Sequence, residues 1–190
     1  MGALDHYVDI DVLPDPDFPV NQVLAALYAK LHRALVAGGS ADIGVSFPGA
    51  DARAPHLGRR LRLHGGADAL AALMARDWLT GVRDHVTTTA PQRVPDGAVP
   101  YAVRRVQAKS NVERLRRRQM RRHGLSEEAA RERIPDGAAQ VLDLPFLEMR
   151  SASTGQTFRL FVSQLPAGSA ATGGEFNAFG MSATVTLPWF

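Results

Sequence analysis

The sequence predicts an α+β fold, and three patterns in its 190 residues lead to that prediction. Residues 6–12 (HYVDIDV) alternate between two sets of side chains, which is typical of a half-buried strand. The two sets are His6, Val8, Ile10 and Val12, and Tyr7, Asp9 and Asp11. In residues 20–35, apolar side chains recur every three or four positions, which indicates an amphipathic helix. Up to residue 86 the predicted elements follow the order βαββαβ. In this ferredoxin-like order, two helices cover one face of a four-stranded antiparallel sheet.

Each element of the first half has a local signal. Pro14, Pro16 and Pro19 end the first strand, and the glycines in residues 37–40 end the helix that follows. The remaining predictions are strands at residues 43–47 and 60–64, a helix at 69–76 with Asp68 as its N-cap, and a last strand at 78–86 interrupted by Gly81.

The polar, proline-rich segment 87–100 predicts a domain boundary. We therefore expect a ferredoxin-like domain at residues 1–94 and a smaller α+β domain at residues 95–190. The second domain is predicted to contain an extended segment, an arginine-rich helix, a helix at Ser126–Arg133 with Ser126 as its N-cap, strands at 146–150 and 158–162, and a last extended stretch near residues 184–186.

Composition excludes several classes of protein. No run approaches about 18 uncharged apolar residues, so no transmembrane helix is expected. The acidic, alternating start argues against a signal peptide, and a cytoplasmic protein is the simplest interpretation. The absence of cysteine excludes disulfides, thiolate catalysis and Cys-ligated metals. None of the six histidines has the spacing of a metal pair, so we expect no metal and no cofactor.

Positive charge is concentrated in residues 110–124 (SNVERLRRRQMRRHG), although the chain has a net charge of only +3. On a helix, Arg114, Arg118 and Arg122 share one face, and Arg117 and Arg121 lie beside them. A solvated surface helix is one interpretation, but such helices usually carry both signs of charge. A polyphosphate partner would relieve the repulsion. No apolar heptads follow, which argues against a leucine zipper. With RNA, the helix would need the widened groove near a hairpin loop or end.

Three further groups of residues are candidates for chemistry. Arg105 and Gln107 fall on one face of an extended segment and suit the edges of guanine and adenine, although ordinary surface polarity is the alternative. His32 lies at the edge of the first helix's apolar stripe, where a partly exposed histidine is ordinary. The patch RSASTGQTFRLF, residues 150–161, combines hydroxyls with Phe158, or else is a polar hairpin turn.

In combination these residues resemble the CRISPR-associated endoribonucleases of subtype I-F systems, which process precursor CRISPR RNA. The similarity is carried by DHYVDI, PDPDFP, KLHRALVAGG, IGVSFP, RVQAKSN, the arginine run with LSEEAARERIPD, LPF, RSASTGQTFRLF and PWF, which span almost the whole chain. The resemblance implies a ferredoxin-like N-terminal domain and a C-terminal half that delivers the arginine helix to a repeat hairpin. It also implies that the protein keeps the processed CRISPR RNA and joins the type I-F surveillance complex.

By position in these motifs, His32 corresponds to the family's catalytic histidine and Ser151 to the serine that orients the ribose. The RNA-binding residues implied by the resemblance and by the arginine run are Arg105, Gln107, Arg114, Arg117, Arg118, Arg121, Arg122, Ser153 and Phe158. Phe179 stands where the family usually has a tyrosine, so a proton-transfer role for that hydroxyl is in doubt here, whereas a packing role against His32 remains open.

Three hypotheses follow. The first is a metal-independent endoribonuclease in which His32 acts as general base and the substrate's 2′-hydroxyl as nucleophile. The second is an RNA-hairpin-binding module without catalysis, to which Phe179 lends some support. The third is a regulator that binds duplex DNA, for which the sequence shows neither a helix-turn-helix nor a zipper.

Overall fold

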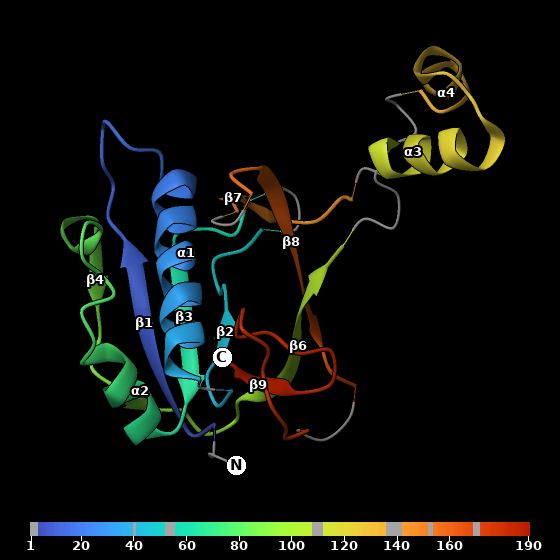
Figure 1. The fold of residues 1–190 in the computed structure, drawn as a ribbon. Coiled ribbons are helices and arrows are strands. Elements are labelled where there is room, and N and C mark those ends of the chain that lie inside the picture. Colours follow the sequence, from blue (N-terminus) through green and yellow to red (C-terminus); the bar gives the residue numbers. More distant parts are fainter. Residues whose placement is uncertain are drawn as a thin grey trace. The chain divides into compact units, whose positions relative to one another are not determined.

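The computed structural model describes residues 4–39, 41–51, 56–107, 112–135, 142–151, 154–168 and 172–190, without the side chains of residues 113 and 114. In chain order the elements are β1 (His6–Val12), α1 (Val20–Gly38), β2 (Gly44–Ser46), β3 (Arg60–Gly65), α2 (Ala67–Met74), the 3₁₀ turn η1 (Arg83–His85), β4 (Val86–Thr88), β5 (Gln92–Arg93), β6 (Val99–Val106), α3 (Val112–His123), α4 (Glu127–Arg133), β7 (Phe146–Arg150), β8 (Thr157–Pro166) and β9 (Thr186–Trp189) (Figure 1). The fold is α+β, as predicted.

The chain forms two compact units. Unit 1 contains residues 1–106 and 144–190, and unit 2 contains residues 107–143. The predicted boundary between residues 94 and 95 stays a prediction. Within the described residues, no helix is long and apolar enough to cross a membrane.

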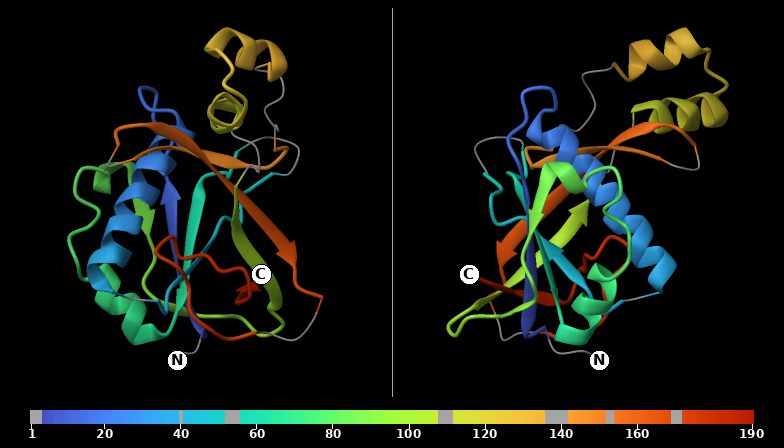
Figure 2. Two further views of the ribbon diagram at one scale, coloured as in Figure 1. Left: turned by 45° about the vertical axis from the view of Figure 1, so that its right-hand side comes forward. Right: turned by 90° about the vertical axis from the view of Figure 1, so that its left-hand side faces the viewer.

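The first sheet of unit 1 is antiparallel, with the strand order β2-β3-β1-β4, and β5 also pairs with β1. Because side chains alternate along a strand, Val8, Ile10 and Val12 of β1 all point to one face, where they are fully buried. Helices α1 and α2 cover this face (Figure 2). Part of the segment 87–100, from which a domain boundary was predicted, also belongs to this sheet, because residues 87–88 of β4 and the whole of β5 pair with β1.

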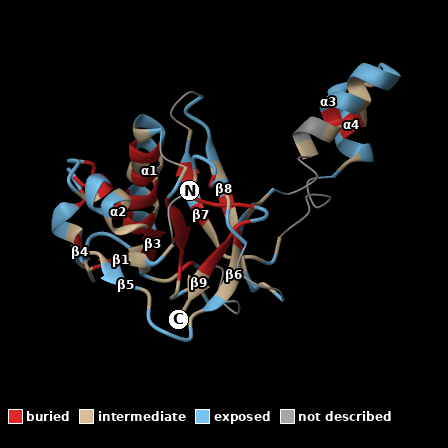
Figure 3. Cartoon of the chain, turned by 90° about the horizontal axis from the view of Figure 1, so that it is seen from below, coloured by how far each residue is buried: buried red, intermediate tan, exposed pale blue. Residues whose placement is uncertain are grey.

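Helix α1 is long because its apolar residues form a continuous stripe. Leu24, Leu27 and Leu31 are almost fully buried, and burial of each contributes about 1.5–3 kcal/mol. The helix ends where Gly39 takes the left-handed conformation, with φ of 59°, and its N–H bonds to the Val36 carbonyl. These residues therefore hold α1 firmly against β1 and β3, and buried residues gather along this contact (Figure 3).

The second sheet of unit 1 is also antiparallel, with the order β7-β8-β6-β9. It shares one apolar core with the first sheet, to which it contributes Leu160, Val162 and Leu187. The two sheets meet closely at Gly44 of β2, where an added Cβ would lie 2.4 Å from the Leu187 side chain and 2.7 Å from that of Phe176. Residues from the end of the chain therefore pack directly on the first sheet.

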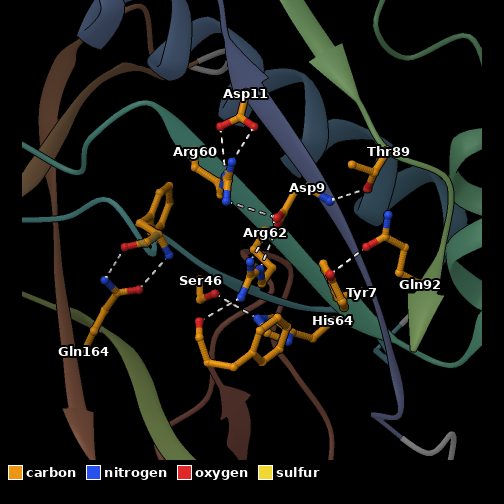
Figure 4. A network of polar contacts seen from close by, with 12 residues as sticks. Tyr7, Asp9, Asp11, Ser46, Arg60, Arg62, His64, Thr89, Gln92 and Gln164 are labelled. Carbon is orange, nitrogen blue, oxygen red and sulfur yellow. Dashed lines mark hydrogen bonds and ion pairs between the residues drawn. The ribbon is translucent and has the colours of Figure 1, made fainter. Parts of the chain in front are cut away.

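The face of the first sheet opposite the helices is polar (Figure 4). Arg62 forms a buried bidentate pair with Asp9, at 2.7 and 2.9 Å, and also donates to the Phe190 carbonyl at 3.1 Å. On the same face, Ser46 Oγ lies 2.8 Å from His64 Nε2. Complete burial, and next the positive charge of Arg62, lower the pKa of His64 to about 3. His64 is therefore a neutral side chain inside unit 1.

Two predictions about the first half were wrong. Of the strand predicted at residues 78–86, only Val86 is in a strand: Gly81 has φ of 77°, which breaks an extended chain, and turns lead from residue 78 through η1 to the short strand β4. Asp68 is not an N-cap, because α2 starts two residues earlier than expected, at Ala67 after the N-cap Gly66, and Asp68 lies in its first turn.

Unit 2 contains α3 and α4. Ser126 caps α4 as predicted, since its hydroxyl accepts the Ala129 N–H at 3.2 Å. Arg116 of α3 is buried, and its guanidinium donates twice to the Ile134 carbonyl, at 2.9 and 2.7 Å. This arginine therefore has a structural role, joining α3 to the end of α4.

Candidate active site

His32 lies in the second half of α1, at the partly exposed edge of the buried stripe. Its Nδ1 is 2.7 Å from the carbonyl oxygen of Ala178, and its ring stacks on that of Phe179, with centroids 4.3 Å apart and planes inclined by 7°. A carbonyl can only accept a hydrogen bond, so Nδ1 carries the proton. In the neutral ring, Nε2 is then the atom with a free lone pair, which is the form that a general base requires.

Both contacts to His32 come from a tight turn at residues 177–181. The side chain of Asn177 accepts hydrogen bonds from the N–H groups of Phe179 and Met181, at 2.8 and 3.3 Å. Gly180 has φ of 66°, and its carbonyl accepts from Val45 N–H of β2 at 2.8 Å. The turn is thus closed by its own asparagine and attached to the first sheet.

Tyr28 holds the same turn from α1. Its hydroxyl donates to the Phe179 carbonyl at 2.7 Å, and its ring is fully buried against Phe47. Burial raises the pKa of Tyr28 far above its ordinary value, so the hydroxyl remains a donor at any physiological pH.

Arg105 and Phe158 lie beside this group. The guanidinium of Arg105, at the end of β6, is 5.0 Å from the centre of the Phe179 ring and 5.7 Å from that of Phe158, on β8. Four of the residues singled out from the sequence (His32, Arg105, Phe158 and Phe179) are therefore linked by ring and guanidinium contacts. An arginine and two aromatic rings beside a histidine can bind a nucleotide by stacking and charge.

Ser151 lies at the hairpin between β7 and β8. Its hydroxyl accepts the Thr154 N–H at 3.2 Å, and its backbone bonds to Gln156 and Gly155. It lines a cavity of about 980 Å³ between α1 and β7, together with Arg33, the residue after His32. His32 itself is not among the residues that line this cavity, so the structure brings Ser151 together with Arg33 and not with the candidate base.

The remaining candidates belong to unit 2 or lie outside the described residues. Arg117, Arg118, Arg121 and Arg122 are all exposed on α3, and Gln107 is exposed just after β6. The side chain of Arg114 and the whole of Ser153 lie outside the described residues. The exposed arginines form a positive surface that can contact phosphates.

Among the described residues, no group of three or more His, Asp or Glu side chains is arranged to hold a metal ion. Sequence reasoning did not identify Tyr28 or Asn177, which hold the turn against His32. The spacing of Tyr28, four residues before His32 and so on the same helix face, was the available signal.

Comparison with known proteins adds three similarities. A family model described as "CRISPR-associated protein (Cas_Csy4)" matches residues 7–190. The chain is 54% identical over 187 residues to the "CRISPR-associated endonuclease Cas6/Csy4" of Pseudomonas aeruginosa (strain UCBPP-PA14). The matched region covers 98% of this chain and 100% of that protein. It is 47% identical over 187 residues to the protein of the same name from Escherichia coli (strain UTI89 / UPEC), with the same coverage.

Proposed function

Since the chain belongs to the Cas_Csy4 family of CRISPR-associated proteins, we propose that it is the endoribonuclease that binds the CRISPR repeat stem-loop and cleaves precursor CRISPR RNA. The observation that carries the catalytic part is the fixed imidazole of His32, whose Nδ1 is bound to a carbonyl and whose ring stacks on Phe179, so that in the neutral ring the lone pair is on Nε2.

In the proposed reaction, Nε2 of His32 takes the proton from the 2′-hydroxyl of the nucleotide before the scissile bond. The 2′-oxygen attacks the adjacent phosphorus, and the bond to the 5′-oxygen of the next nucleotide breaks. That oxygen takes a proton from water and leaves as a 5′-hydroxyl, while His32 keeps the proton of the 2′-hydroxyl until it returns it to solvent. The other product carries a 2′,3′-cyclic phosphate, or a 3′-phosphate after hydrolysis. The nucleophile belongs to the substrate, so only a ribose at this position allows cleavage.

Other residues would hold the RNA. Ser151 would bind the ribose through its hydroxyl, and Phe158 would stack on a base at the foot of the stem, beside the guanidinium of Arg105. Arg105 and Gln107 would read base edges there. Phe179 has no hydroxyl, so its contribution would be the stacked contact that keeps the His32 ring in place.

The exposed arginines of α3 would grip the phosphates of the stem, and Arg116 would not take part because its guanidinium is already bound to Ile134. A phosphate-binding helix requires arginines that solvent can reach, and α3 has exposed arginines at positions 117, 118, 121 and 122. Affinity for the hairpin would therefore fall steeply with salt.

The assignments of domains, location and partners rest on the same family membership. We assign the first half of the chain to a ferredoxin-like domain, supported by the element order β1-α1-β2-β3-α2-β4 and the strand order β2-β3-β1-β4. The boundary after residue 94, a cytoplasmic location, retention of the cleaved RNA and assembly with the type I-F surveillance complex belong to the proposal as well.

The test is cleavage of an end-labelled repeat hairpin with a 3′ flank, in excess EDTA. The wild-type protein should cut the RNA but not a matched substrate with a 2′-deoxy sugar at the scissile position. His32→Ala should lose roughly 10²- to 10⁴-fold in rate while still binding the hairpin. Tight binding by the wild-type protein without cutting of either substrate would instead support the alternative, a hairpin-binding module without catalysis.

A further inference from the structure

Two side chains of α1, one helical turn apart, bind two successive carbonyls of one turn. Tyr28 donates to the carbonyl of Phe179, and His32 donates to that of Ala178, each at 2.7 Å. Residues four apart on a helix lie on the same face, so both donors reach the turn together. The histidine and the tyrosine therefore form a matched pair of attachments between α1 and residues 177–181.

The attachment through Tyr28 is the rigid one of the two. Tyr28 is fully buried, whereas His32 is partly exposed, and the Tyr28 ring is packed against Phe47. On the other side of the contact, Asn177 and Ala178 are exposed, so water competes for the Ala178 carbonyl. A buried donor on the next carbonyl limits how far this carbonyl can move away from the imidazole.

We propose that Tyr28 is a positioning residue for RNA cleavage: its hydroxyl holds the 177–181 turn so that the Ala178 carbonyl keeps the proton of His32 on Nδ1 and leaves Nε2 free to act as the base. This inference rests on the proposed function of His32. Tyr28 touches neither RNA nor the reacting atoms in this scheme, and it acts only through the turn and the imidazole.

The variant that tests this is Tyr28→Phe, which keeps the buried ring and removes only the hydroxyl. The matched control is Tyr7→Phe, which removes a hydroxyl that donates to Gln92 at 2.6 Å, on the polar face of the first sheet. Single-turnover cleavage of the repeat hairpin at saturating protein should slow roughly 3- to 10-fold in Tyr28→Phe, the equivalent of one hydrogen bond. Tyr7→Phe should cut at the wild-type rate, and both variants should bind the hairpin as the wild type does.

A second readout separates positioning from general loosening of the fold. Two-bond ¹H–¹⁵N spectra of histidine-labelled protein, at about pH 8 where an ordinary imidazole is neutral, report which ring nitrogen carries the proton. The His32 signals are assigned by their loss in His32→Ala. We expect a protonated Nδ1 in the wild type and in Tyr7→Phe, and a mixture of the two tautomers in Tyr28→Phe.

A wild-type cleavage rate in Tyr28→Phe would overturn the proposal. So would a slower rate with the His32 tautomer unchanged, because the hydroxyl would then serve only the stability of unit 1. Failure of the proposed function looks different: His32→Ala would cut as fast as the wild type, while the spectra of Tyr28→Phe would still report whether the tyrosine holds the imidazole.

Discussion

Acidification from pH 7 to pH 5 is expected to destabilise unit 1 by about 2 kcal/mol through His64 alone. Burial lowers the pKa of His64 to about 3 in the folded protein, whereas the unfolded chain has the ordinary value of 6.5. Between these two values the unfolded state binds a proton that the folded state does not. Stability is therefore fully present above pH 6.5 and is lost as the pH falls, by about 1.4 kcal/mol per pH unit.

The measurement is urea unfolding followed by tryptophan fluorescence, because Trp78 and Trp189 both belong to unit 1. The unfolding curves are measured between pH 5 and pH 7.5, so that the carboxyls of Asp5 and Asp15 do not titrate in this range. Hydrogen bonds lower the pKa values of both carboxyls from the ordinary 3.8. His64→Gln should be less stable at pH 7 but should lose most of the pH dependence. His123→Gln, which changes an exposed histidine of α3, should keep it. An unchanged slope in His64→Gln would refute the reasoning.

Four further variants have expected outcomes, one of them, Gly97→Ala, as the control for Gly180→Ala. Asp9→Ala leaves the buried guanidinium of Arg62 without its main partner and should cost about 3–5 kcal/mol in the free energy of unfolding; a loss below about 1 kcal/mol would show that the pair is dispensable. Gly180→Ala combines a left-handed backbone with an added Cβ 2.8 Å from Val45, so it should cost about 2–4 kcal/mol and slow cleavage. Gly97→Ala has a similar φ but open space, and should lose only the conformational part, about 1–2 kcal/mol, with normal cleavage. Arg118→Ala should reduce the salt slope of hairpin affinity by about one, and an unchanged slope would argue that this arginine contacts no phosphate.

Much of the fold could be predicted from periodicity because the responsible residues are close in sequence. The apolar stripe of α1 and the N-cap of α4 are local patterns, and the structure confirms both. The error at residues 78–86 has a physical cause: Trp78, Leu79 and Val82 are buried side chains of turns, and hydrophobicity alone does not distinguish them from a strand. The left-handed Gly81 decides the outcome.

The candidate site was predicted less completely, although the family resemblance is confirmed by matches that cover nearly the whole chain. The resemblance named His32 and Phe179, and they lie stacked in the structure, while their roles stay predictions. The attachment of His32 to the Ala178 carbonyl could not be found in the sequence, because every residue has a carbonyl and only the fold brings this one to the imidazole. The burial of Arg116 could not be predicted from the arginine run either, because only the fold brings the Ile134 carbonyl to its guanidinium.

The order of the chain in unit 1 has a consequence for its synthesis. Strand β6 lies between β8 and β9 in the second sheet, and both neighbours follow unit 2 in the sequence. On the ribosome, β6 therefore emerges with both edges unpaired. Its first neighbour, β8, is complete only after residues 107–166 are translated, and its second, β9, only after residue 189. At about 5–20 residues per second these intervals last roughly 3–12 s and roughly 4–17 s. Unpaired strand edges associate readily with other chains. The nascent protein is thus most prone to aggregate during these intervals, and slower translation of the second half would lengthen them.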